Sequence, residues 1–122
     1  MRTTILRPRN GAVETASADN HSWGVVAEWD GQAVSGTEHV EIHRSAHGVV
    51  LLVRICAGGR FPLHAGSVNS VCQIVAGHGT VGLPNGAEVA YRAPELFVFE
   101  PGTLHAWRAQ TDTEFTVCEI SA

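Results

Sequence analysis

Two stretches of the sequence decide the fold. The first reads Gly58-Gly59-Arg60-Phe61-Pro62-Leu63-His64-Ala65-Gly66-Ser67-Val68-Asn69-Ser70 and continues as an apolar run that ends at Gly77. The second reads Phe97-Val98-Phe99-Glu100-Pro101-Gly102-Thr103-Leu104-His105-Ala106-Trp107. Between them lie short apolar pieces broken by Gly and Pro, a pattern typical of strands joined by tight turns. The sequence around His64 and His105 therefore predicts β-structure.

These stretches resemble the two motifs of the cupin superfamily, whose forms are G-x5-HxH-x3-4-E-x6-G and G-x5-P-x-G-x2-H-x3-N. His64 falls on the first histidine of motif one, and Gly77 falls on its closing glycine. Gly102 and His105 fall on motif two. The positions that depart from the motifs are Gly66 for the second histidine, Ser70 for the glutamate, Glu100 for the motif-two proline and Pro94 for the opening glycine. The resemblance implies a small barrel that lacks half of the usual four-ligand metal site.

Composition limits the class of protein. A chain of 122 residues with 44% hydrophobic and 16% charged residues is typical of one ordered globular domain. Helical patterns are scarce, which favours an all-β fold. The net charge of −4 and the lack of a basic cluster argue against a nucleic-acid partner. The sequence contains no lysine, so a Schiff base on a side-chain amine is excluded.

Location follows from the termini and the cysteines. The first residues lack the apolar run of a secretory signal, and no stretch approaches the ~20 apolar residues that span a bilayer. The three cysteines, Cys56, Cys72 and Cys118, have no CxxC spacing. An odd number of such cysteines favours reduced thiols. We therefore expect a cytoplasmic protein with no membrane partner.

The chain divides into an N-terminal arm, residues 1–22, and a cupin-like barrel domain, residues 23–122. We expect an edge strand in the arm around Thr3 to Leu6. The domain is predicted to be a six- to eight-stranded antiparallel barrel or jelly roll, the double-stranded β-helix of cupins, with a cavity inside its mouth. The run from Trp29 to His64 also loosely resembles the cupin subgroup related to the anti-sigma factor ChrR. Edge strands of such a barrel need protection, which favours a homodimer.

The segment from Glu38 to Arg44 alternates in polarity. This pattern predicts a strand that turns His39 and His43 to solvent. The spacing of His39, His43 and His47 also fits one face of a helix, where the three could form an alternative metal site. Two tryptophans, Trp23 and Trp29, are predicted to share one strand face as core or interface anchors.

The candidate site follows from the parity of side chains along a strand. His64 and Gly66 face the same side, because side chains alternate. The resemblance places Ser70 and Cys72 on the adjacent strand, and it brings His105 in from across the barrel with Trp107 beside it. We predict that these residues line one cavity, and that His39, His43 and His78 do not.

Several functions fit such a cavity. In one, His64 and His105 hold a divalent transition metal such as iron, nickel, zinc or copper, weakly because three or more ligands are usual. In another, no metal is bound and a histidine acts as general acid or base. Both would make the protein an enzyme of dioxygenase, isomerase or cyclase type that acts on a small molecule. The alternatives are a ligand-binding sensor without catalysis, and a nucleophile pair of Ser70 and Cys72 with His105.

Overall fold

The computed structural model describes residues 3–17 and 22–121, and within these ranges the chain forms strands and turns but no helix. The strands are β1 (Thr4–Arg9), β2 (Ala12–Ser17), β3 (Gly24–Trp29), β4 (Gln32–Ser45), β5 (Gly48–His64), β6 (Asn69–Ala76), β7 (His78–Gly82), β8 (Glu88–Arg92), β9 (Glu95–Phe99), β10 (His105–Ala109) and β11 (Thr113–Ile120). None of the described residues belongs to a helix that is long and apolar enough to cross a membrane.

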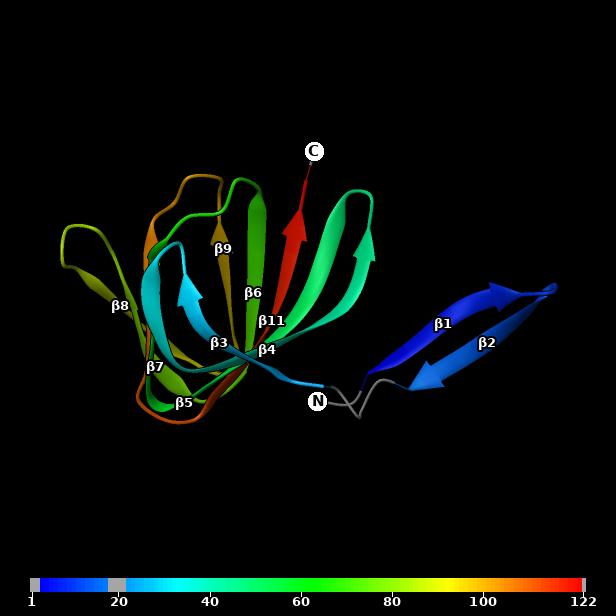
Figure 1. Cartoon of the computed structure of the whole chain (residues 1–122), viewed down its shortest axis with the longest axis horizontal. Helices are drawn as coiled ribbons and strands as arrows, with labels where there is room; N and C mark the ends of the chain where they lie inside the picture. The colour runs from blue at the N-terminus through cyan, green and yellow to red at the C-terminus, as the bar shows by residue number, and fades with distance from the viewer. Residues whose placement is uncertain (1–2, 18–21, 122) are drawn as a thin grey trace.

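The strands from β3 onward form one antiparallel sheet that curls into a barrel (Figure 1). Its order is β8-β7-β10-β5-β11-β6-β9, with β4 paired to β5 and β3 paired to β4. The prediction of an all-β jelly-roll barrel is confirmed. The predicted strand number was too low, because the sheet has nine strands among the residues described.

Strand β5 joins the two halves of the barrel. One of its edges pairs with β4, while the other edge pairs first with β11 and then with β10. The change of partner occurs around Gly58 and Gly59. A Cβ on Gly59 would lie 2.6 Å from Ile55 Cγ2 and 2.9 Å from the Cys56 carbonyl oxygen, so only glycine fits there. The strand nevertheless continues through both glycines and carries His64 at its end.

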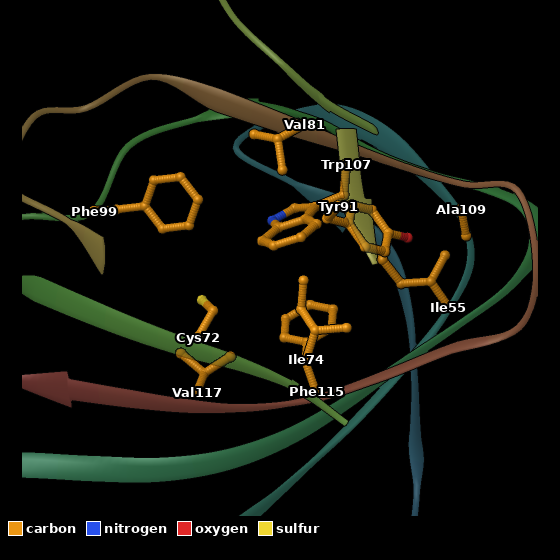
Figure 2. Packing of buried hydrophobic residues seen from close by; sticks show 10 residues of the cluster. All are labelled: Ile55, Cys72, Ile74, Val81, Tyr91, Phe99, Trp107, Ala109, Phe115 and Val117. Atoms are coloured by element: carbon orange, nitrogen blue, oxygen red, sulfur yellow. The ribbon is translucent and has the colours of Figure 1, made fainter. Parts of the chain in front are cut away.

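The hydrophobic core lies inside the curled sheet and adjoins the cavity. Its buried cluster contains Ile55, Cys72, Ile74, Val81, Tyr91, Phe99, Trp107, Ala109, Phe115 and Val117 (Figure 2). Trp107 lies at the centre of this cluster and stacks on Phe115, with ring centroids 4.7 Å apart. The hydroxyl of Tyr91 is satisfied by Thr113 Oγ1 at 2.7 Å. The core therefore fixes the strand that carries both Trp107 and His105.

The structure explains why motif one ends in a glycine, Gly77. Its φ is +92°, in the left-handed region that glycine adopts at little cost. A Cβ there would lie 2.3 Å from the carbonyl oxygen of Asp112. Both constraints require glycine at the point where β6 passes into β7.

The arm predicted at the N-terminus forms a hairpin. Strands β1 and β2 pair only with each other, as a two-stranded sheet to one side of the barrel (Figure 1). Asn10 and Gly11 make its turn, with φ values of 49° and 77°. The strand expected around Thr3 to Leu6 is thus present as β1, but it extends to Arg9.

Candidate functional site

A cavity of about 340 Å³ opens inside the barrel. The structure places every site residue that the sequence predicted on its wall: His64, Ser70, Cys72, His105 and Trp107. Gly66 also lines the cavity, although β5 ends at His64 and the parity argument does not reach beyond it.

His64 and His105 form a close pair, which we call the histidine pair. They are direct register partners on the neighbouring strands β5 and β10, and their ring centroids lie 4.3 Å apart at an interplanar angle of 52°. The expectation that His105 enters from across the barrel was therefore wrong. Strand β5 changes partner from β11 to β10 along its length, so its end lies beside β10 and the two sequence motifs meet on adjacent strands.

Both imidazoles are oriented in the same way. Nδ1 of His64 lies 2.9 Å from the carbonyl oxygen of Pro62, and Nδ1 of His105 lies 2.9 Å from that of Thr103. A carbonyl oxygen only accepts hydrogen bonds, so each Nδ1 carries the proton and donates it. In the neutral form each Nε2 then has a free lone pair. The histidine pair thus presents two bases, or two metal-ligand atoms.

Burial keeps the pair neutral. It lowers the pKa of His105 to about 4, chiefly by desolvation, and the neighbouring His64 lowers it further against the opposing hydrogen bond to Thr103. The pKa of His64 is also lowered by desolvation, while the Pro62 carbonyl, Asp30 and Glu119 act in the opposite direction. At neutral pH both lone pairs are therefore available.

Aromatic rings hold the pair in place. Phe99 stacks on His105 with centroids 3.7 Å apart and planes 9° apart. Phe61 contacts His64 edge-on at 4.5 Å. Trp29 lies 6.2 Å from His64 and is 43% exposed, so it stands at the cavity and not in the core. Trp23 precedes β3, so the prediction that the two tryptophans share one face of a strand was wrong; the guanidinium of Arg54 lies over the Trp23 ring, 4.1 Å from the centroid.

Cys72 is part of the cavity wall and of the core. Burial raises the pKa of its thiol to about 11, and its sulfur lies 3.9 Å from Ser70 Oγ. A thiol of this kind stays protonated at neutral pH, whereas the thiolate is the nucleophile. The nucleophile pair of Ser70 and Cys72 is therefore unfavourable chemically.

The prediction for β4 was partly wrong. His39 and Glu41 line the cavity, although both residues are exposed to solvent as predicted, whereas His43 and His78 lie outside it as expected. A register shift between Glu41 and His43 reverses the parity of the strand, so that Arg44 also lines the cavity. Since His43 and His47 are not on the wall, the alternative metal site of three histidines does not form there.

Sequence reasoning missed the carboxylates of the cavity. Glu41, Glu100 and Glu119 line it together with Arg44. A signal existed for Glu119, because Phe115 and Val117 on the same strand face also line the cavity. A polar residue at the next inward position of an apolar strand indicates a site.

The donor set fits a tightly bound metal poorly. Two imidazoles fall short of the three or more protein ligands that hold such ions. Gly66 and Ser70 occupy the positions of the missing motif ligands, and the Cys72 thiol is not ionised. Among residues 3–17 and 22–121, no group of three or more His, Cys, Asp or Glu side chains is arranged to hold a metal ion.

A curled antiparallel sheet with two motif histidines directed into its cavity is the architecture of a small cupin domain. No protein-family model matches this sequence, and no curated protein matches it. Solved structures do match. The chain is similar to an RmlC-like cupin from Shewanella frigidimarina NCIMB 400, with a TM-score of 0.72 and 14% identity over 86% of this chain and 87% of that one.

Two other solved structures are similar to this chain. One is the polyketide cyclase RemF from Streptomyces resistomycificus, with a TM-score of 0.73 and 15% identity over 84% of this chain and 75% of that one. The other is KdgF from Halomonas sp., with a TM-score of 0.69 and 16% identity over 86% of this chain and 91% of that one. At these identities the likeness shows the fold: the chain folds as a small cupin domain.

Proposed function

We propose that this protein is a small-molecule cupin enzyme of isomerase or cyclase type, in which His64 and His105 move a proton on a ligand bound in the barrel. One observation carries the proposal: two neutral imidazoles face the barrel cavity with their ring centroids 4.3 Å apart, and each has its Nδ1 held by a backbone carbonyl. Such a pair has a fixed orientation and free Nε2 lone pairs, which is what general-base catalysis requires.

The reaction step is simple. Nε2 of one histidine takes a proton from a carbon next to a ligand carbonyl, and the C–H electron pair forms an enolate. The imidazolium then returns the proton to another atom of the ligand, which completes an isomerisation. In a cyclisation the enolate carbon attacks a second carbonyl of the same molecule, and the proton goes to the new alkoxide. Only one of the two Nε2 atoms carries the transferred proton at a time, because two adjacent imidazolium charges repel each other.

The likeness to the polyketide cyclase RemF supports a reaction of this class. Dioxygenase chemistry, the other expectation, depends on a redox metal, and a donor set of two imidazoles fits such an ion poorly. Proton transfer needs only the side chains that are present. It is therefore the function that the geometry supports best.

Proton exchange tests the proposal without knowledge of the substrate. The protein would be incubated in D2O with cyclohexanone, an aliphatic ketone, and with 2-tetralone, an aryl ketone, and exchange of the protons next to the carbonyl followed by NMR. We expect faster exchange than in buffer for at least one ketone, and a loss of about 10²-fold in His64→Asn and His105→Asn. Asparagine can still donate to the carbonyl but lacks the base, and His43→Asn on the same barrel is the matched control.

A ligand-binding role without catalysis is the second candidate, because a mostly apolar cavity would serve it equally well. It predicts a different result. A ketone would shift the NMR signals of the cavity residues, while its protons exchanged no faster than in buffer. That outcome would replace the enzyme with a sensor.

The assembly and location remain part of the proposal. We propose a homodimer, which is supported by the terminal strand β9, where Leu96 and Val98 are 63% and 64% exposed. We propose a cytoplasmic location with no nucleic-acid or membrane partner, which the free thiols of Cys56, Cys72 and Cys118 support. Light scattering at several concentrations measures the first, and fractionation of cells measures the second.

A further inference from the structure

Aromatic rings make up much of the cavity wall. The aromatic side chains that line it are Trp29, Phe61, Phe99, Trp107 and Phe115. The rings of Trp29 and Phe61 lie 5.6 Å apart, on the side of His64. Phe99 covers one face of His105. Rings pack well against other rings, either offset or edge-on. The wall is therefore suited to a flat, ring-containing ligand.

The charges at the cavity are unequal in sign. Three carboxylates, Glu41, Glu100 and Glu119, line it, against the single guanidinium of Arg44 among the residues described. Arg44 Nε donates to Glu41 Oε1 at 2.8 Å, so the positive charge is already paired. An anionic ligand would meet the excess of negative charge, which is unfavourable.

The histidine pair determines which polar group a ligand must present. Since both Nδ1 atoms donate to backbone carbonyls, both Nε2 atoms are acceptors in the neutral state. A ligand atom placed against them must donate a hydrogen bond. The burial that keeps the imidazoles neutral also disfavours a formal charge on the ligand beside them, whether positive or negative. A neutral hydroxyl satisfies both conditions.

We propose that the cavity takes a flat, uncharged ring molecule that presents a phenolic or enolic O–H to His64 and His105. This inference rests on the proposed function, because an enol and its ketone tautomer give the same enolate, whether Nε2 takes the proton from the O–H or from the carbon next to the carbonyl. The proton moves to Nε2 and the O–H electron pair stays on oxygen, which leaves an enolate or phenolate beside an imidazolium. Carboxylates and phosphates of similar size are excluded by the acidic side chains.

A series of ligands on one ring skeleton tests this. The probes are 2-naphthol, 2-naphthoate, 2-naphthylmethylammonium and 2-methoxynaphthalene, titrated at neutral pH and followed by protein NMR. We expect 2-naphthol to bind at least tenfold more tightly than each of the others. Tighter or equal binding of 2-naphthoate or the ammonium compound would overturn the charge argument. Equal binding of 2-methoxynaphthalene would overturn the need for a donor.

Substitutions of the two charged residues Glu119 and Arg44 should change the affinity for 2-naphthoate in opposite directions. Glu119→Gln should raise the affinity for 2-naphthoate and leave 2-naphthol nearly unchanged, whereas Arg44→Gln should weaken 2-naphthoate further. If Glu119→Gln does not raise 2-naphthoate binding, the acidic side chains do not exclude anions and the inference fails. Binding of no member of the series would also overturn it. The proposed function is judged separately by exchange of cyclohexanone, which has no aromatic ring, so the two failures are distinguishable.

Discussion

The buried histidine pair makes stability depend on pH in a way that can be calculated. The pKa of His105 is about 4 in the folded protein, against 6.5 when the imidazole is exposed. Between these values the unfolded chain binds more protons than the folded one, so stability falls as the pH falls. Because each pKa unit corresponds to about 1.4 kcal/mol, His105 alone costs ~3 kcal/mol below pH 4. Between pH 7 and pH 5 the cost is ~2 kcal/mol.

Urea unfolding in EDTA-containing buffer at pH 7, 6 and 5, followed by tryptophan fluorescence, measures this cost. The parent should lose ~2 kcal/mol of unfolding free energy between pH 7 and pH 5 through His105, in addition to a smaller loss in the same direction from His64. His105→Asn should remove that part of the pH dependence, since the amide can still donate to the Thr103 carbonyl but does not titrate. His43→Asn, which removes an exposed imidazole of β4, should retain the parent's pH dependence.

The refuting result is specific. If the parent and His105→Asn lose the same free energy between pH 7 and pH 5, His105 is not held neutral by burial. Desolvation would then not account for a free lone pair on Nε2 at neutral pH. If the parent instead lost unfolding free energy as the pH rose, both the sign and the size of the predicted pH dependence would be wrong.

Three further predictions concern the metal ligands, the motif glycine and the cysteines. Gly66→His combined with Ser70→Glu should raise metal affinity by more than ~10–100-fold, because both positions line the cavity and a Cβ at Gly66 meets nothing closer than 3.6 Å. The metal content of the purified double variant and of the parent measures this. No gain in a folded double variant would show that the new ligands do not reach the histidine pair. Gly77→Ala should destabilise the protein by more than Gly86→Ala. Both glycines have a positive φ, which costs an alanine about 1–3 kcal/mol, but only a Cβ at position 77 would also clash with Asp112. Equal denaturation midpoints of the two variants would contradict the steric argument. At pH 8 a thiol with a pKa of about 11 is ionised in roughly one molecule in 10³, so a disulfide reagent should modify the exposed Cys56 long before Cys72, and rapid modification of Cys72 in a Cys56→Ser variant would contradict its burial.

The sequence predicted the barrel, and it predicted that His64 and His105 line the cavity, because motif residues mark each of these positions locally. Gly77 must be glycine for steric reasons, and it therefore marks a motif reliably. Side-chain parity along β11 places Phe115, Val117 and Glu119 on one face, so Glu119 could also have been found. Such features are visible in a single stretch of chain.

Other features depend on pairing between strands and were not visible. The shift between Glu41 and His43 turns Arg44 inward and His43 outward, which reverses the simple alternation on which the prediction relied. The register that sets His105 directly opposite His64 likewise depends on where β5 bends and changes partner. A bulge or a bend leaves little trace in polarity patterns, so the contacts of β4 and the distance between the histidines required the structure.

The departure from the motif at Ser70 also explains the chemistry of the histidine pair. A carboxylate at position 70 would stabilise an imidazolium in the cavity, because an opposite charge raises the pKa of a histidine. Ser70 supplies no such charge, and burial therefore determines the pKa of His105. Asp30 and Glu119, the register partner of Ser70 on the neighbouring strand, raise the pKa of His64, but desolvation outweighs both. Loss of the carboxylate thus removes a metal ligand and, through the same change, leaves a neutral base.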